Sequence, residues 1–282
     1  MVKNETINKA IEYIFTHIND KLTVDEIASY CNFSKYHFCR LFKEEMGESL
    51  YSFIKRNKIM RSATSLKAEK EKSITEIGLD CGYSASNYAT AFKELLNQSP
   101  AQFRKERKHT NHVIQNPFMQ QECRAFQTFE EYNEKISIVT LPDYYVYYQR
   151  FQGSYMELRE HWKKFTMEYG NQKEEGGLFI ERSFSDPDVV ANEQCLCDLC
   201  MTVPKNSTLR PTTIIQGGKY AIYHFNDHRR EIYGVYQGLT CVWLPASNYT
   251  LDQRNFFDII RKADCEHEEF ELDICIPIQS VK

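Results

Sequence analysis

An internal repeat at an offset of fifty positions constrains the fold of this chain more than any other feature. Residues 23–55 align with residues 73–105, so that Phe42-Lys43-Glu44 falls on Phe92-Lys93-Glu94. Each copy opens with a hydroxyl residue followed three positions later by Glu, which is the capping-box pattern that begins a helix. The repeat therefore predicts two copies of one small helical unit.

A second helix is expected after a short break in each copy, beginning at the capping residues Ser34 and Ser84. Apolar residues then recur at the i, i+3 and i+4 spacing that buries one helix face, namely Phe38, Leu41 and Phe42 in one copy and Tyr88, Ala91 and Phe92 in the other. A short helix, a tight turn and a second amphipathic helix form a helix-turn-helix. A long helical pattern from Tyr51 to about Lys67 joins the two motifs, so residues 1–108 are expected to form an all-α domain.

The charge of the chain divides near the end of this domain. Residues 1–112 hold 18 of the 35 Lys and Arg residues and 14 of the 39 Asp and Glu residues, which gives this part a net charge of +4. The rest hold the remaining 17 and 25, a net charge of −8. A basic N-terminal part suits a nucleic-acid partner, and an acidic C-terminal part repels one. Residues 109–122 are polar and unpatterned, which is typical of a linker.

A metal site in this linker is the alternative for His109 and His112. No cluster of Cys or carboxylate residues lies beside them to complete a ligand set, so we interpret both as solvated linker residues. We therefore expect no metal site and no cofactor.

The remaining residues, 123–282, show the period-two alternation of β-strands and a second repeat, at an offset of 75. Val146-Tyr147-Tyr148 falls on Ala221-Ile222-Tyr223, and Asp198 falls on Asp273. Each half has the pattern strand, helix, strand, strand. We expect two β-α-β-β modules related by a pseudo-twofold axis, with two sheets that form a trough and helices behind it. The expected fold class is multidomain, all-α followed by α+β.

The N-terminal motifs resemble the AraC/XylS signature over about the first 108 residues. The resembling runs are Ile74-Thr75-Glu76-Ile77-Gly78, Gly82-Tyr83-Ser84, Phe92-Lys93-Glu94 and Ser99-Pro100-Ala101-Gln102-Phe103-Arg104. Asn97 stands where the family usually has Gly, and Asn tolerates the left-handed turn. The resemblance implies a sequence-specific transcription regulator, expected to be an activator, with double-stranded promoter DNA and RNA polymerase as partners.

The exposed face of each second helix predicts the residues that contact DNA. On the first helix, Arg40 can bind a guanine edge and Tyr36 can pack on a thymine methyl group. Because Thr90 occupies the place of Arg40 in the second copy, we expect the first helix to dominate base readout. The predicted set is Lys35, Tyr36, His37, Cys39, Arg40, Lys43, Arg56, Arg61, Ser86, Asn87, Thr90 and Arg104.

Within this set, charge distinguishes the residues expected to bind phosphates from those expected to read bases. Lys35, Lys43, Arg56 and Arg61, together with Lys55, are expected to bind phosphates. For Tyr36 and His37 the alternative is simple packing on the domain surface.

The C-terminal motifs resemble the GyrI-like effector-binding domain, the Rob type, over about residues 125–280. The resembling pieces include Leu141-Pro142, Gly153-Ser154-Tyr155, Gly217-Gly218-Lys219-Tyr220-Ala221, Trp243-Leu244-Pro245, Phe257-Asp258-Ile259 and Leu272-Asp273-Ile274-Cys275-Ile276. The resemblance implies a pocket whose late-strand carboxylate receives cationic, apolar small molecules. That position is Asp258, where the family usually has Glu.

Aromatic residues around such a carboxylate would give a lipophilic cation both charge pairing and cation–π contact. We name Phe256, Trp162, Trp243, Tyr147 and Tyr223 as candidate effector contacts and Glu181 as a second acid. The alternative is that these rings belong to the core.

Hydrolases in this family rely on Glu plus Tyr, and Ile260 stands where that Tyr is expected. We therefore predict no catalytic residue and no enzyme activity. The alternative function is a GyrI-like hydrolase or a ligand-sequestering protein with a vestigial DNA-binding module.

Ten cysteines raise the question of redox or zinc chemistry at Cys195, Cys197 and Cys200. Strand alternation places Cys200 on the other face, and nearby sequence offers no fourth zinc ligand. Core packing is favoured, and a redox role stays open.

The location of the chain is predicted from two absences in its sequence. No apolar run reaches about 20 residues, and the N-terminus lacks the pattern of a signal peptide. We expect a cytoplasmic protein without a membrane partner, acting as a monomer or a dimer.

Overall fold

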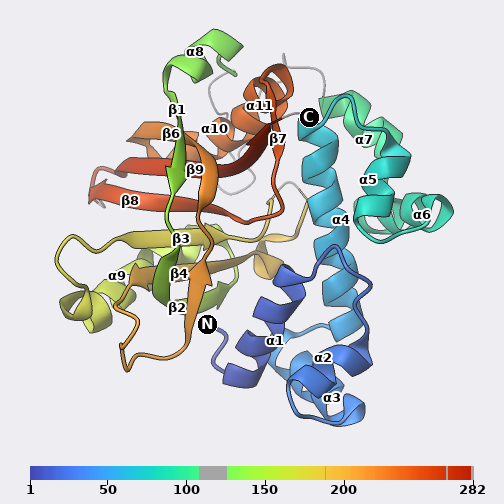
Figure 1. The fold of residues 1–282 in the computed structure, drawn as a ribbon, viewed down its shortest axis with the longest axis horizontal. Coiled ribbons are helices and arrows are strands. Elements are labelled where there is room, and N and C mark those ends of the chain that lie inside the picture. Colours follow the sequence, from blue (N-terminus) through green and yellow to red (C-terminus); the bar gives the residue numbers. More distant parts are fainter. Residues whose placement is uncertain (108–125, 188, 265, 281–282) are drawn as a thin grey trace. The chain divides into compact units, whose positions relative to one another are not determined.

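The computed structural model describes residues 1–107, 126–187, 189–264 and 266–280. The chain divides into two compact units, Met1–Arg107 and Lys108–Lys282, which are blue to cyan and green to red in Figure 1. The expected linker, residues 109–122, lies outside the described residues, as do His109 and His112.

Both predicted helix-turn-helix motifs are present in the first unit. They consist of α2 (Val24–Tyr30) with α3 (Lys35–Met46), and of α5 (Ile74–Asp80) with α6 (Ala85–Leu96). The long helix α4 (Leu50–Ala68) joins them, α1 (Glu5–Thr16) precedes them and α7 (Pro100–Arg107) follows them. The all-α prediction for this part of the chain is confirmed.

The helix ends follow the capping chemistry with one exception. A full capping box forms between Ser73 and Glu76 at α5, and the Thr23 side chain accepts from the Glu26 N–H at α2. Asn97 takes the left-handed conformation that was expected of it, with φ of 56°. Ser34 and Ser84 stand at the N-cap positions of α3 and α6 but make no side-chain cap hydrogen bond, so that part of the prediction is wrong.

The two copies of the repeat are packed in the same way. Phe42 meets Phe53 edge to face at 5.3 Å between ring centroids, and Phe92 meets Phe103 at 5.4 Å. Between the copies, the Lys58 ammonium donates to the carbonyl of Asp20 at 2.7 Å and to that of Cys81 at 3.1 Å. Helix α4 therefore holds both motifs on one shared core.

One continuous antiparallel sheet dominates the second unit, in the order β1-β6-β9-β8-β3-β4-β2-β5, with β7 paired to β9 off this path. The strands are β1 (Ile136–Leu141), β2 (Tyr144–Gln152), β3 (Phe179–Ser183), β4 (Leu196–Thr202), β5 (Thr212–Ile215), β6 (Gly218–His228), β7 (Tyr249–Leu251), β8 (Phe256–Asp264) and β9 (Glu269–Ser280).

The predicted modules appear as β2-α9-β3-β4 and β6-α10-β8-β9, where α9 is Leu158–Tyr169 and α10 is Ile232–Gly238. The expectation of two sheets is wrong, because β3 pairs with β8 and joins both modules edge to edge. Glu181 and Asp258 are direct partners in that central register.

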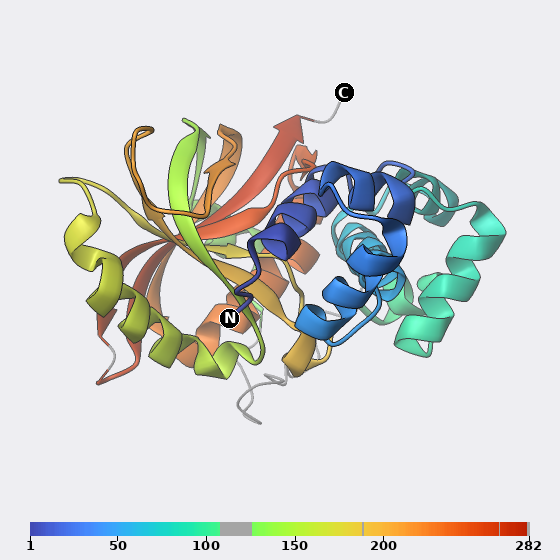
Figure 2. The same ribbon diagram turned by 90° about the horizontal axis from the view of Figure 1, so that it is seen from below.

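Helices α9 and α10 lie on one side of the sheet, as Figure 2 shows. Trp162 of α9 donates to Glu181, and Tyr236 of α10 donates to Asp258. Because Glu181 and Asp258 point to the same face, the two acids lie on the helix-bearing face rather than on the face opposite the helices. This corrects the expected position of the helices behind the trough.

Short helical turns surround these elements. The 3₁₀ turns η1 (Tyr155–Glu157) and η4 (Arg229–Glu231) lead directly into α9 and α10. Other 3₁₀ turns are η2 (Gly170–Gln172) and η3 (Asn192–Gln194). After α10 come the π-helical turn η5 (Leu239–Trp243) and α11 (Leu244–Ala246), and α8 (Phe129–Glu134) packs against η5. In the part of the chain that the structure describes, no helix combines the length and the apolar character that a bilayer span requires.

Candidate functional sites

The outer face of α3 presents side chains of the kinds that read DNA bases. Tyr36 is 81% exposed. The Arg40 side chain is 63% exposed, with its Nε 3.7 Å from the carboxylate of Glu44, one turn further along the helix. The His37 ring is exposed and meets Phe33 edge to face at 5.2 Å, and Cys39 is half-buried beside this face. Phe38 and Phe42 are fully buried, which fixes the rotation of the helix.

The outer face of α6 is exposed in the same way, but its side chains at the matching positions are short and uncharged. Ser86, Asn87 and Thr90 are all exposed. The Thr90 hydroxyl donates to the Ser86 carbonyl at 3.2 Å, so it is already engaged within its own helix. No arginine occupies this face, and the difference between the two helices that the sequence indicates is present in the structure.

The predicted phosphate ligands divide by their surroundings. Lys43 is exposed. Lys35 is exposed and donates to Asp25 at 2.7 Å, which raises the pKa of its ammonium. Lys55 donates to Glu94 of α6 at 2.5 Å, and Arg61 is half-buried on α4.

Two arginines on or near α4 have surroundings that the sequence did not predict. Arg56 is only 5% exposed, and its Nη2 lies 2.5 Å from the Glu48 carboxylate. This arginine stabilises the domain interior and is withdrawn from the phosphate ligands. Arg104 is half-buried with Nε and Nη2 enclosed and without a hydrogen-bond partner, and burial lowers the pKa of its guanidinium.

Glu181 of β3 and Asp258 of β8, which we call the acid pair, form the most unusual feature of the second unit. They face each other across the central strand pair, and Asp258 is 5% exposed. The Trp162 indole N–H donates to Glu181 Oε2 at 2.8 Å, and the Tyr236 hydroxyl donates to Asp258 Oδ1. Two neutral donors, one from each helix, therefore hold the two carboxyl groups in place.

The pKa values of both carboxyl groups in the acid pair are raised. Burial raises the pKa of Asp258 well above its usual range, the nearby Glu181 raises it further, and the Tyr236 hydrogen bond opposes the shift. Burial also raises the pKa of Glu181, against the Trp162 hydrogen bond and the charge of Arg229. No ion pair to either carboxyl group is present among the described residues. A raised pKa favours the neutral form of each carboxyl group, and a nearby cation would favour the charged form.

Only some of the predicted aromatic contacts lie beside this pair. Phe256 stacks on Tyr236 with 6.4 Å between ring centroids, and Trp162 contacts Glu181 directly. Tyr147 is buried, stacked on Phe165 at 5.8 Å beneath α9. Its predicted role as a wall of the effector site is corrected, because the ring belongs to the core.

Trp243 and Tyr223 lie elsewhere as well. Trp243 is 1% exposed and donates to Asn133 of α8. Tyr223 packs against Tyr132 of α8 and lines a separate pocket of about 240 Å³ between α8, β6 and α10. Trp243 is therefore a core ring beneath α8, whereas Tyr223 lines a pocket away from the acid pair, and its role as an effector contact stays a prediction.

Sequence reasoning missed Tyr236, which donates to Asp258. Nothing in the local pattern separates Tyr236 from Tyr233, the other tyrosine of its helix, since its contact depends on the rotation of α10 over β8.

The three clustered cysteines are fully buried. Burial raises the pKa of the Cys197 thiol well above its usual range, which leaves little of the reactive thiolate form. Cys195 and Cys200 contact the backbone carbonyls of Ala191 and Asp198. In the described residues no group of three His, Cys, Asp or Glu side chains is placed to hold a metal ion. These observations support core packing.

Comparison with known proteins gives two family matches. A model described as a GyrI-like small molecule binding domain matches residues 134–279, and one described as a helix-turn-helix domain matches residues 21–106. The transcription factor PqrA of Proteus vulgaris is 32% identical over 101 residues, covering 35% of this chain and 82% of that protein.

A longer relative and two solved structures match between 40% and 97% of the chain. An HTH-type transcriptional regulator of Staphylococcus aureus (strain COL) is 26% identical over 145 residues, which is 51% of this chain and 18% of that protein. The chain thus spans less than a fifth of the length of that relative. EcmrR in a DNA complex aligns over 97% of this chain and 95% of its own, with a TM-score of 0.46 and 10% identity. The C-terminal domain of AraT from Geobacillus stearothermophilus aligns over 40% and 95%, with a TM-score of 0.36 and 27% identity.

Proposed function

Because the chain belongs to the family of GyrI-like small-molecule-binding domains and carries an AraC-type helix-turn-helix domain ahead of it, we propose that it is a DNA-binding transcription regulator. The N-terminal unit binds promoter DNA, and the C-terminal unit binds a small molecule that adjusts regulation. RNA polymerase is the partner that an activator of this kind recruits.

The observation that carries the DNA-binding role is the pair of exposed, equally packed second helices with different outer faces. In our proposal Arg40 and Tyr36 of α3 read bases in the major groove. His37, Lys35, Lys43 and Arg61 hold the nearby backbone, and Ser86, Asn87 and Thr90 of α6 make short contacts to a second half-site. Two such helices in one chain serve an asymmetric site without a second copy.

The acid pair supports an organic cation as the class of effector. The buried Asp258 and the half-buried Glu181 each accept a hydrogen bond from one neutral aromatic donor, and they gain a counter-charge when a cation binds. A flat or aromatic cation adds stacking on Trp162 and Phe256 to this charge pairing.

We further propose that the chain is not an enzyme. Ile260 shares the strand face of Asp258, so the extra hydroxyl on which the family's hydrolases rely is missing from that position. Tyr236 does contact Asp258, but its hydroxyl is held as a donor to that carboxylate and burial raises its pKa.

Genome-wide mapping of bound sites, with and without the lipophilic cation tetraphenylphosphonium, tests this proposal. We expect discrete sites that share one sequence motif and lie beside promoters whose transcription changes with the cation. Uniform occupancy without a motif would contradict the regulator function. If the purified chain nevertheless bound the cation, that result would favour the ligand-sequestering alternative.

A further inference from the structure

The strand at one end of the sheet, β1, leaves its outer edge open. Among the strands that the structure describes, β1 pairs with β6 and with no other. Ile138 is 40% exposed and Val139 is 38% exposed, although consecutive side chains of a strand point to opposite faces. The strand, which follows α8 in Figure 1, is therefore accessible from both faces as well as along its outer edge.

β1 lacks the features that normally keep an open edge from pairing. Natural edge strands are commonly very short, or they carry charged residues, proline or a bulge. The sequence of β1, Ile-Ser-Ile-Val-Thr-Leu, holds no charge and no proline, and its register with β6 is unbroken from Ile136 to Leu141. The strand at the other end of the sheet, β5, is shorter and follows Pro211 directly. β1 is thus the edge that can accept a further strand.

One backbone contact shows which residues of β1 direct their hydrogen-bonding groups outward. The His224 N–H donates to the Lys135 carbonyl at 3.2 Å, just before β1 begins. In an antiparallel pair, residues that exchange hydrogen bonds with the neighbouring strand alternate with residues that do not. Counted from Lys135, this alternation turns the N–H and C=O groups of Ile136, Ile138 and Thr140 away from β6, and we call these residues the outward set.

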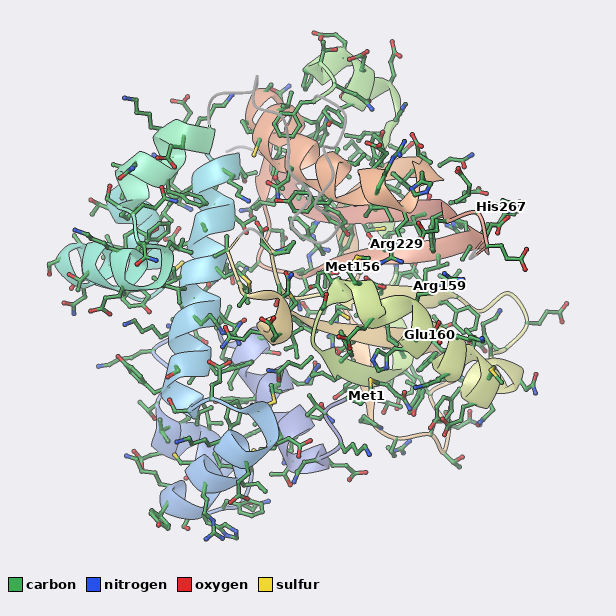
Figure 3. The ribbon with its side chains drawn as sticks, turned by 180° about the vertical axis from the view of Figure 1, so that it is seen from behind. Met1, Met156, Arg159, Glu160, Arg229 and His267 are labelled. Atoms are coloured by element: carbon green, nitrogen blue, oxygen red, sulfur yellow. The ribbon has the colours of Figure 1, made fainter. Side chains whose placement is uncertain are left out.

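The helical elements near β1 make their contacts on its inner side. α8 packs against η5, and its Tyr132 contacts Tyr223 of β6, the strand that lies on the inner side of β1. The turns η1 and η4 contact each other instead, where Arg229 Nη2 approaches the Met156 carbonyl at 3.5 Å, as Figure 3 shows. A second strand can therefore approach β1 from outside these described elements.

We propose that the outer edge of β1 is the interface of a twofold dimer, in which the β1 strands of two copies of this chain pair antiparallel with Ile138 on the axis. In this register Ile138 pairs with itself across the axis, and Ile136 of each copy pairs with Thr140 of the other. Each N–H and C=O group of the outward set then gains a partner. The facing side chains are β-branched and uncharged, so they pack well across paired strands. This self-complementary pattern favours a second copy as the occupant, and the dimer joins two chains that each carry their own pair of DNA-reading helices.

The charges that flank β1 favour the same antiparallel arrangement. Lys135 precedes the strand and Asp143 follows it after Pro142, and all of these residues are exposed. Antiparallel pairing brings the Lys135 end of each copy beside the Asp143 end of the other, so opposite charges meet at both ends of the interface. The nearby acid Glu134 is the last residue of α8, which packs on η5.

Sedimentation velocity of the full chain over a range of protein concentrations, without DNA or cation, tests this interface. We expect wild type to dimerise. Ile138→Lys sets like charges against each other at the axis and should raise the dissociation constant of the dimer at least about tenfold. Ile214→Lys is the matched control and should dimerise as wild type does, because Ile214 is 50% exposed on the opposite edge strand, β5.

Charge exchange tests the register. Ile138→Glu should also lose the dimer when alone, whereas an equimolar mixture of Ile138→Lys and Ile138→Glu should dimerise again, because this residue faces itself across the axis. Thermal unfolding of each variant shows whether the fold is kept. A wild type that stays monomeric, a dimer that survives Ile138→Lys, a dimer lost in Ile214→Lys as well, or a mixture that fails to pair would overturn the proposal.

Amide hydrogen exchange gives a second readout that needs no variant. In a monomer the N–H groups of the outward set exchange rapidly, whereas those of the alternate residues Ser137, Val139 and Leu141 are protected by β6. Dimerisation should protect both sets, and dilution should release only the outward set. Rapid exchange of the outward set at concentrations where the chain is dimeric would contradict pairing through β1. These measurements involve neither DNA nor an effector, so their outcome is separate from that of the proposed function.

Discussion

Replacement of Arg40 by alanine is expected to weaken binding to the operator by about 5- to 150-fold, which corresponds to the ~1–3 kcal/mol that a bidentate contact to a base contributes. The reason is that Arg40 provides the exposed guanidinium on α3, whereas α6 offers only short side chains at the matching positions. Fluorescence anisotropy with a labelled operator fragment at about 150 mM salt measures this effect.

Thr90→Ala is the matched comparison, because Thr90 occupies the position of Arg40 in the repeat. Its hydroxyl already donates to Ser86, so we expect its loss to change affinity by less than about threefold. Arg40→Ala should also relax the preference at one base pair, while loss of the phosphate ligand Lys43 should weaken all sequences equally. Equal effects of Arg40→Ala and Thr90→Ala would contradict the dominance of the first helix.

Replacement of Asp258 by asparagine is expected to abolish cation binding and to stabilise the fold at neutral and alkaline pH. The folded-state pKa of Asp258 lies above its unfolded value. Between those two values the folded chain binds more protons than the unfolded chain, so the free energy of unfolding falls as pH rises. Asparagine does not titrate and removes this loss, so we expect Asp258→Asn to unfold at a higher temperature than wild type at pH 8.

Thermal unfolding from about pH 5 to pH 8 measures the difference, with Glu160→Gln as control, since Glu160 is an exposed acid on α9. The stability gap between Asp258→Asn and wild type should widen with pH, and Glu160→Gln should show no such trend. In wild type, the affinity for tetraphenylphosphonium should rise with pH, because a charged carboxylate attracts the cation more strongly than a neutral carboxyl group does. Asp258→Asn that binds the cation like wild type would remove Asp258 from the effector site.

The DNA-binding unit could be predicted almost completely from the sequence, because its signals are local. Capping residues, the buried Phe positions and the left-handed Asn97 all act within a few residues of chain. Arg56 is the exception, since a basic residue on a helix next to a DNA-binding motif has the same pattern whether it faces solvent or Glu48. Its burial depends on the ion pair with Glu48 in the turn between α3 and α4, which helical periodicity does not encode.

The proposed effector site was harder to predict, because it is built from pairings distant in the sequence. Strand alternation gives the face of Asp258 but does not show that β3 and β8 join the two modules into one sheet. Aromatic composition likewise does not separate a ring that contacts the acid pair, Trp162, from a core ring such as Tyr147. Tyr223 and Trp243 are covered by α8, a short helix whose docking depends on a close approach of Tyr132 to Gly238.

The central claim is that this chain recognises DNA by sequence. The most direct test is a competition measurement in which the full chain, bound to a mapped operator fragment at about 150 mM salt, is challenged with unlabelled operator or with scrambled DNA of the same composition. We predict that the operator competes about 1,000-fold more effectively than the scrambled DNA. Equal competition by the two would contradict the account.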